Sequence, residues 1–183
     1  MTELNIKKEL EDNQILVLLL PSIDYNKDIV KIVKILSDKK ILYVTLNKTH
    51  ESLIEIFKKS KIDVSNITYI DAISKTFKLE HPPTENCHFC SSPGSLTELS
   101  LLINKLLKGK FDYFIFDSIT SLLIYEQGKP VAKFISDIMN KLKSSETKAI
   151  FYALDVKEHE STIKECCMFA DNAINLKDVE NIN

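Results

Sequence analysis

Residues 15–36 read ILVLLLPSIDYNKDIVKIVKIL, and this stretch indicates the class of fold. Its first six residues are apolar without interruption, which is typical of a strand buried on both faces of a parallel sheet. From Asp28 to Leu36 apolar residues recur with a helical period and leave lysines on the opposite face. A buried strand that leads through a short turn into an amphipathic helix is the basic unit of an α/β protein.

The same alternation continues along the chain. We predict a long irregular loop at 74–94, which is rich in prolines and polar residues. Thr49 is predicted to cap the start of a helix. Ser95 and Glu98 are spaced as a capping box. The remaining strands are predicted at 41–46, 66–71, 113–117, 148–154 and 172–176, and the helices at 3–12, 49–62, 95–110 and 131–145. The sequence therefore predicts a three-layer αβα sandwich with a mostly parallel central sheet, in one domain spanning 1–183.

Composition and charge restrict the function. The chain has 183 residues and a formal net charge of -2, which argues against a general nucleic-acid binder. All 24 basic residues are lysine, so the chain cannot supply an arginine finger. The charged start MTELNIKKELEDN does not resemble a secretory signal, and the longest apolar run, 15–20, is too short to cross a bilayer. We therefore expect a cytoplasmic protein without nucleic-acid or membrane partners.

Ligands in open α/β sheets bind beyond the carboxyl ends of the strands. The segments to consider are therefore 21–28, 47–49, the pair Asp117 and Ser118, and Asp155. An apolar strand that ends in Asp-Ser can hold the water shell of Mg²⁺ in phosphate-loop enzymes. The alternative is that Asp117 only forms a hydrogen bond with the following turn.

Four segments in order resemble the RecA/KaiC-like branch of the P-loop ATPases. They are ILVLLL (15–20), LYVTLNKTHESL (42–53), YFIFDSITSL (113–122) and FADNAINL (169–176). The resemblance implies that the first strand enters a phosphate loop and that glutamates after the second strand activate water. It also implies that Asp117, with Ser118, supplies the magnesium site.

The phosphate loop departs from the family pattern. Aligned on G-x-x-x-x-G-K-[ST], Pro21 and Asn26 replace the glycines, Lys27 keeps the lysine, and Asp28 replaces the hydroxyl residue. The glycines allow backbone N–H groups to turn inward around a phosphate, and proline has no N–H. Asp28 places an anion where the phosphate would lie.

A second departure follows the second strand. Asn47 and Lys48 stand where the family has its water-activating glutamates, and neither is a suitable general base at neutral pH. The resemblance therefore implies an inactivated member of archaeal signal-transduction type with a degenerate Walker A motif. We expect a non-catalytic pseudo-ATPase without cofactor, which acts as a regulatory or signalling module. Its partner would be another protein, such as an active relative, or a second copy of itself.

The alternative function is an ATP-binding protein or slow ATPase with an unconventional phosphate loop. It would bind ATP and Mg²⁺ through the surviving lysine and the Asp-Ser pair, which makes Lys27, Asp117 and Ser118 the candidate cofactor-binding residues.

Cysteines and histidines offer a third possibility. Cys87 and Cys90 have the C-x₂-C spacing of a zinc knuckle, which His81 or the pair Cys166 and Cys167 could complete. One such pair is a weak signal, so ordinary reduced thiols are the favoured interpretation and no metal is expected. His50 and His159 are each surrounded by charged residues and are predicted to lie at the surface.

Overall fold

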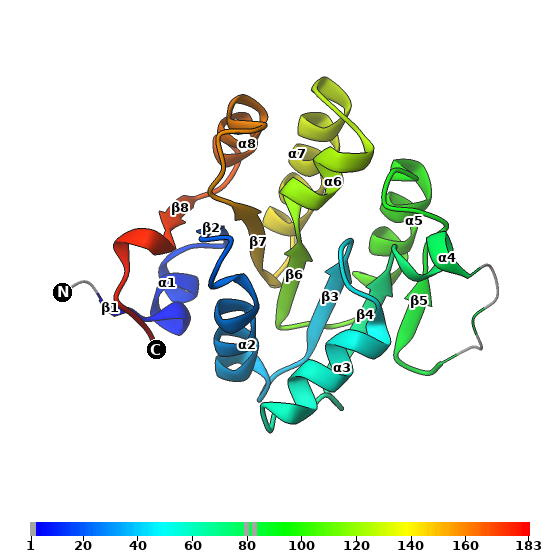
Figure 1. Cartoon of the computed structure of the whole chain (residues 1–183), viewed down its shortest axis with the longest axis horizontal. Helices are drawn as coiled ribbons and strands as arrows, with labels where there is room; N and C mark the ends of the chain where they lie inside the picture. Colours follow the sequence, from blue (N-terminus) through cyan, green and yellow to red (C-terminus); the bar gives the residue numbers. More distant parts are fainter. Residues whose placement is uncertain (1–2, 79–80, 82–83) are drawn as a thin grey trace.

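The computed structural model describes residues 3–78, 81 and 84–183. Its centre is a seven-stranded parallel sheet in the order β5-β4-β3-β6-β7-β2-β8 (Figure 1). The strands are β2 (Ile15–Leu20), β3 (Ile41–Thr45), β4 (Ile67–Asp71), β5 (Cys87–Phe89), β6 (Tyr113–Asp117), β7 (Lys148–Leu154) and β8 (Asn172–Asn175).

Helices cover both faces of this sheet. The side chains of β2 show why, because Leu16 and Leu18 enter one hydrophobic cluster while Ile15 and Val17 enter the other. The first cluster contains α1 (Ile6–Asp12), α2 (Tyr25–Leu36) and α3 (His50–Lys59). The second contains α5 (Leu96–Leu106), α6 (Ile119–Tyr125), α7 (Lys129–Lys143) and α8 (Glu160–Cys167). The predicted three-layer αβα sandwich is therefore confirmed.

The two ends of the chain meet beside α1. β1 (Glu3–Leu4) pairs in parallel with β9 (Asn181–Ile182), which follows the 3₁₀ helix η1 (Leu176–Asp178). The Asn183 N–H donates to the Leu4 carbonyl at 2.8 Å, and the Ile6 N–H donates to the Asn183 carbonyl at 3.0 Å. The helix predicted at 3–12 is accordingly shorter, because its first residues belong to this strand pair.

The stretch 74–94 is more regular than predicted. It contains α4 (Ser74–Phe77) and β5, which extends the sheet by pairing with β4 in the register Tyr69 to Cys87. Backbone hydrogen bonds to a neighbouring strand hold this three-residue strand, so its own sequence gives little sign of it. Residues 79–80 and 82–83 of the predicted loop lie outside the described residues.

Helix starts were predicted with mixed success. The Thr49 cap is confirmed, since its hydroxyl accepts the Ser52 N–H at 3.2 Å. The capping box is wrong, because the Glu98 carboxylate instead accepts the Ser91 N–H at 3.0 Å. Helix α2 begins at Tyr25, before its apolar stripe, and the short helices α6 and α8 were not predicted.

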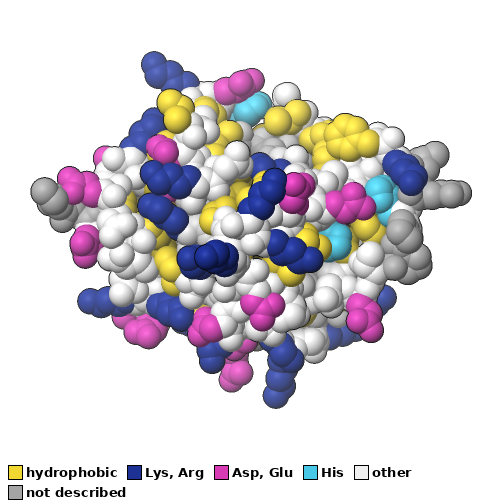
Figure 2. Space-filling view, turned by 60° about the horizontal axis from the view of Figure 1, so that its bottom comes forward, with side chains coloured by type: hydrophobic (Ala, Val, Ile, Leu, Met, Phe, Trp, Pro, Cys, Tyr) yellow, Lys and Arg dark blue, Asp and Glu magenta, His cyan; other side chains and the backbone are white. Residues whose placement is uncertain are grey.

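The surface carries charges of both signs. On the face shown in Figure 2, lysine and acidic side chains are interspersed around small hydrophobic areas. Within the ranges that the structure describes, no helix is both long and apolar enough to cross a membrane.

Candidate functional site

The sheet brings three of the predicted segments together at its carboxyl edge. β6 lies between β3 and β7, with Asp117 in register with Thr45 on one side and Tyr152 on the other. Asn47 follows β3 by two residues, and Tyr25 begins the helix that follows β2. Parallel strands therefore place these side chains at one position in space, as the fold class predicts.

Asp117 is fully buried and both of its carboxyl oxygens have partners. The Tyr43 hydroxyl is hydrogen-bonded to Oδ2 at 2.5 Å, and the Asn47 amide donates to Oδ1 at 3.1 Å. Burial raises the pKa of this carboxyl well above its ordinary value, since a charge there would lose its hydration. The position that the resemblance assigned to a magnesium ligand thus favours a neutral acid within an internal network.

The two departures from the family pattern are in contact with each other. The amide of Asn47 donates a second hydrogen bond, at 2.9 Å, to the hydroxyl of Tyr25, the residue just before Asn26 in the 21–28 stretch. The Lys48 ammonium lies 4.9 Å from the centroid of the Tyr25 ring, within the range of a cation–π interaction. Burial lowers the pKa of Lys48. Asn47 and Lys48 therefore both contact Tyr25, the first residue of α2.

The turn between β2 and α2 is short and open to solvent. Only residues 21–24 separate the strand from the helix, and the Ile23 side chain at the tip is 98% exposed. The Lys27 side chain is 66% exposed, and its ammonium lies 3.8 Å from the Asp24 carboxylate. The Asp28 N–H already donates to the Asp24 carbonyl at 2.9 Å, as the first hydrogen bond of the helix.

Asp28 is buried in the first turn of α2. Its pKa is raised, first by burial and then by the charge of Asp24, although Lys27 and Lys31 oppose the shift. The hydroxyl of Tyr152 is fully buried, and it has no hydrogen-bond partner among the described residues. Burial and then the charges of Asp117 and Asp28 raise the pKa of Tyr152 well above its ordinary value.

Ser118 serves the next helix. Its hydroxyl accepts the Ser121 N–H at 3.1 Å and lies 2.9 Å from the Ser121 hydroxyl, so it caps α6. The peptide bond between Asp117 and Ser118 is cis. Of the three candidate cofactor-binding residues, Asp117 and Ser118 therefore bond to their own chain, and Lys27 projects toward water.

Three tyrosines complete this site and were missed in the sequence. Tyr25, Tyr43 and Tyr152 each place a hydroxyl group near the carboxyl edge from a different element. A tyrosine inside an otherwise aliphatic strand, such as Tyr43 in ILYVT, is the signal that could have found one of them, since a buried hydroxyl needs a partner.

The cysteine pair is divided between the two cores. Cys87 packs in the cluster of α1 to α3, whereas Cys90 packs in the cluster of α5 to α8. Burial raises the pKa of Cys87 to about 12 and that of Cys90 to about 11, which favours inert thiols. Within 3–78, 81 and 84–183, no group of three or more His, Cys, Asp or Glu residues is arranged to hold a metal ion.

The residues considered as further ligands are the pair Cys166 and Cys167, and His81. Cys166 is buried and Cys167 is half-buried in α8. This helix connects β7 and β8, at the end of the sheet that is opposite to β5. The ring of His81 stacks on Phe89 with centroids 4.7 Å apart.

His50 lies in the interior, which corrects the prediction of a surface histidine. It is 8% exposed, and its ring meets that of Tyr69 edge-on at 4.8 Å between centroids. Its backbone N–H donates to the buried Asp71 carboxylate at 2.7 Å, which draws the start of α3 against β4. Burial lowers the pKa of His50. His159 is half-buried.

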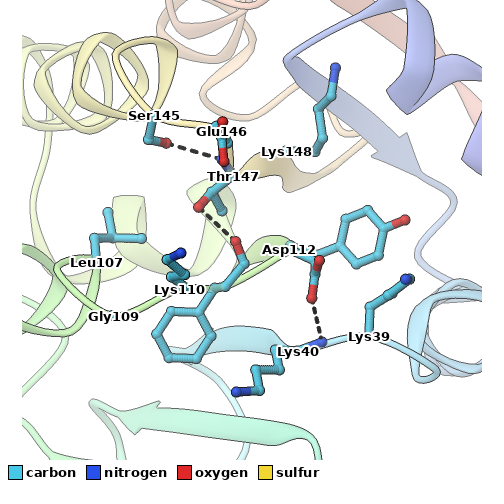
Figure 3. Close-up of a pocket in the computed structure, with 12 residues that line it drawn as sticks. Lys39, Lys40, Leu107, Gly109, Lys110, Asp112, Ser145, Glu146, Thr147 and Lys148 are labelled. Atoms are coloured by element: carbon cyan, nitrogen blue, oxygen red, sulfur yellow. Dashed lines mark hydrogen bonds between the residues drawn. The ribbon is translucent and has the colours of Figure 1, made fainter.

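A polar groove of about 460 Å³ lies at the opposite, amino edge of the sheet (Figure 3). Lysines from three segments line it, yet the side chains of Lys39, Lys40 and Lys148 point in different directions. The Asp112 carboxylate accepts the Lys40 N–H at 2.9 Å at its centre. The charged side chains of this groove do not converge on one point. The groove also lies at the opposite edge of the sheet from the site described above.

Comparisons with known proteins identify the fold. No protein-family model and no curated protein matches the sequence. The flagellar accessory protein FlaH from Methanocaldococcus jannaschii has a similar structure, with a TM-score of 0.61 and 12% identity. A KaiC-like protein, PH0186, from Pyrococcus horikoshii OT3 gives a TM-score of 0.56 at 12% identity. Each comparison covers 88% of this chain and 70% of the other. The chain has the RecA/KaiC-like fold.

Proposed function

We propose that this protein is a non-catalytic pseudo-ATPase that acts as a regulatory or signalling module through contacts with other proteins. One observation carries the proposal, which is the Asn47 amide that bridges the Tyr25 hydroxyl and the Asp117 carboxyl. Asn47 stands where the resemblance implies a water-activating glutamate. Its two hydrogen bonds join the degenerate phosphate loop to the magnesium position.

Magnesium and a nucleotide do not fit this arrangement. A metal on Asp117 would require a charged carboxylate in a buried position and would displace the bonds from Tyr43 and Asn47. Each buried group left without a partner costs about 1–3 kcal/mol. Lys27 is turned to solvent, and Pro21 has no N–H for a phosphate.

We propose that the chain lacks turnover and that its function is assembly with other proteins. We propose a protein partner, such as an active RecA/KaiC-like relative, or self-association, in the cytoplasm and without nucleic acid or membrane. Several large apolar side chains support a role in contacts, because Ile23, Phe77, Ile124 and Met168 are each more than two-thirds exposed.

A nucleotide titration tests the proposal. Isothermal calorimetry with ATP to millimolar concentration, with and without Mg²⁺, should give no binding heat for the wild-type protein. Lys27→Ala should behave identically. Lys34→Ala is the matched control, since this exposed lysine lies at the far end of the same helix. Mg²⁺-dependent binding that Lys27→Ala abolishes and Lys34→Ala retains would instead support the ATP-binding alternative.

A further inference from the structure

The second helical layer contains a groove that the site described above does not use. Helix α5 lies beside α6 and α7 in Figure 1, and two adjoining hollows of about 590 and 420 Å³ follow its outer side. Leu96, Thr97 and Leu101 line both hollows, so the two form one continuous groove. One hollow continues to Glu126 and the other to the first two turns of α7.

Apolar side chains dominate this groove. Leu101 stands in the middle of α5 with 66% of its surface exposed, which is unusual for a leucine in an otherwise amphipathic helix. Leu96, Pro130 and the buried Phe134 line the same hollow as Leu101. An exposed leucine in a hollow lined by further apolar side chains provides the apolar centre of a docking surface.

The charges around the groove are predominantly acidic. Four charged side chains line it, and two of them, Lys133 and Asp137, form an ion pair at 2.9 Å. The other two, Glu98 and Glu126, border the same hollow. A hydrogen bond from Ser91 lowers the pKa of Glu98, so this carboxylate stays charged. Among the described residues, neither glutamate has a cation within ion-pair distance.

We propose that this groove binds an amphipathic helix of a partner protein, with a stripe of leucine-like side chains flanked by lysine or arginine. A helix suits the groove because α5 and α7 are themselves helices of one layer, and a third helix can pack its ridge between them. The lining residues of α7, from Pro130 to Asp137, extend about 12 Å along the helix axis, which accommodates anchors at i, i+3 or i+4, and i+7. The basic residues would face Glu98 and Glu126.

This inference rests on the proposed function, because an interaction module needs a surface for its partner. The two remain separable in experiment. Nucleotide titration reports on the carboxyl edge of the sheet, whereas helix binding reports on the outer side of α5. The groove can therefore fail its test while the pseudo-ATPase proposal stands, and the reverse also holds.

The test uses two synthetic helices as probes. Both are peptides of about 15 residues with the same leucine stripe, flanked by lysines in one and by glutamates in the other. We expect the lysine peptide to bind the full chain in fluorescence anisotropy and Leu101→Asp to raise its Kd by at least about tenfold. Glu126→Lys should weaken the lysine peptide and strengthen the glutamate peptide. Glu51→Lys, the same charge reversal at an exposed glutamate of α3 in the other helical layer, should leave the binding of both peptides unchanged.

Three results would overturn the inference. The first is no binding of the lysine peptide at high micromolar concentration, and the second is equal binding of the two peptides. The third is a wild-type dimer in sedimentation analysis that Leu101→Asp separates, because the occupant would then be a second copy of this chain. Circular dichroism of each variant establishes that the fold is retained, and Leu101→Ala provides a milder truncation with the same expected direction.

Discussion

The junctions β6–α6 and β2–α2 lie at the same edge of the sheet but are built in opposite ways. At the first, Asp117 and Ser118 are buried, and their side chains bond to Tyr43, Asn47 and Ser121. At the second, residues 22–24 are exposed, and Lys27 has only a distant ion pair. A ligand site needs convergent groups that are unsatisfied until the ligand arrives. Here the side chains of Asp117 and Ser118 already have partners, and the exposed side chains of the β2–α2 turn do not converge.

The largest expected effect comes from breaking the buried junction. Asp117→Ala should lower the free energy of unfolding by about 3 kcal/mol, because it leaves the Tyr43 hydroxyl and one Asn47 N–H without partners and opens a small cavity. Asp117→Asn should cost distinctly less, since an amide, like a neutral carboxyl, offers one donor side and one acceptor. Urea unfolding measures both, and equal losses would mean that Asp117 is charged in the folded protein.

The pH dependence of stability tests the protonation state of Asp117 in the wild-type protein. Because burial raises the pKa of Asp117, the folded protein binds this proton more tightly than the unfolded chain does. The resulting stabilisation is complete below about pH 4 and is lost as pH rises through the folded pKa. His50, whose pKa is lowered by burial, has the opposite slope.

The Asp117→Asn variant isolates this contribution, because His50 and Asp28 are common to both proteins. Urea midpoints at about pH 5 and about pH 8 should show the wild type losing more stability than the variant as pH rises. Parallel pH curves would contradict a neutral Asp117.

Replacing a buried tyrosine by phenylalanine at two positions should change the free energy of unfolding by a smaller amount, with a different sign at each position. Tyr43→Phe removes a hydroxyl bonded to Asp117 and should destabilise by about 1–2 kcal/mol. Tyr152→Phe removes a buried hydroxyl that has no partner among the described residues, so we expect no loss and up to about 1 kcal/mol of gain. Thermal unfolding of both variants checks the sign. Destabilisation by Tyr152→Phe would indicate a buried water at that hydroxyl.

Much of the fold was predictable because buried parallel strands leave unbroken apolar runs. ILVLLL at 15–20 and KAIFYAL at 148–154 are examples, and both are strands in the structure. The elements that were missed are short. β5 has three residues and is held by pairing with β4, and α6 is a seven-residue helix directly after a strand, where no separate helical period can develop.

The candidate site was predictable only in its parts. The strand order that sets Asp117 beside Thr45 and Tyr152 follows from long-range pairing, which a single sequence does not encode locally. Two departures from the family pattern are visible in the sequence, at 21–28 and at Asn47 with Lys48, but the contact between them is not. They meet because the Asn47 amide and the Lys48 ammonium, just after β3, both contact the side chain of Tyr25. Residue type alone does not predict that geometry.

Lys27→Ala should have the smallest effect, less than about 0.5 kcal/mol on unfolding, because the lysine is mostly exposed and its carboxylate partner is 3.8 Å away. Thermal unfolding with and without millimolar ATP and Mg²⁺ measures both of its possible roles at once. If Lys27 held a phosphate, the wild type would show a nucleotide-dependent rise in Tm and Lys27→Ala would not. The Tm values of the two proteins without nucleotide would hardly differ. If neither condition separates Lys27→Ala from Lys34→Ala, Lys27 contributes to neither nucleotide binding nor stability, in contrast to the buried Asp117.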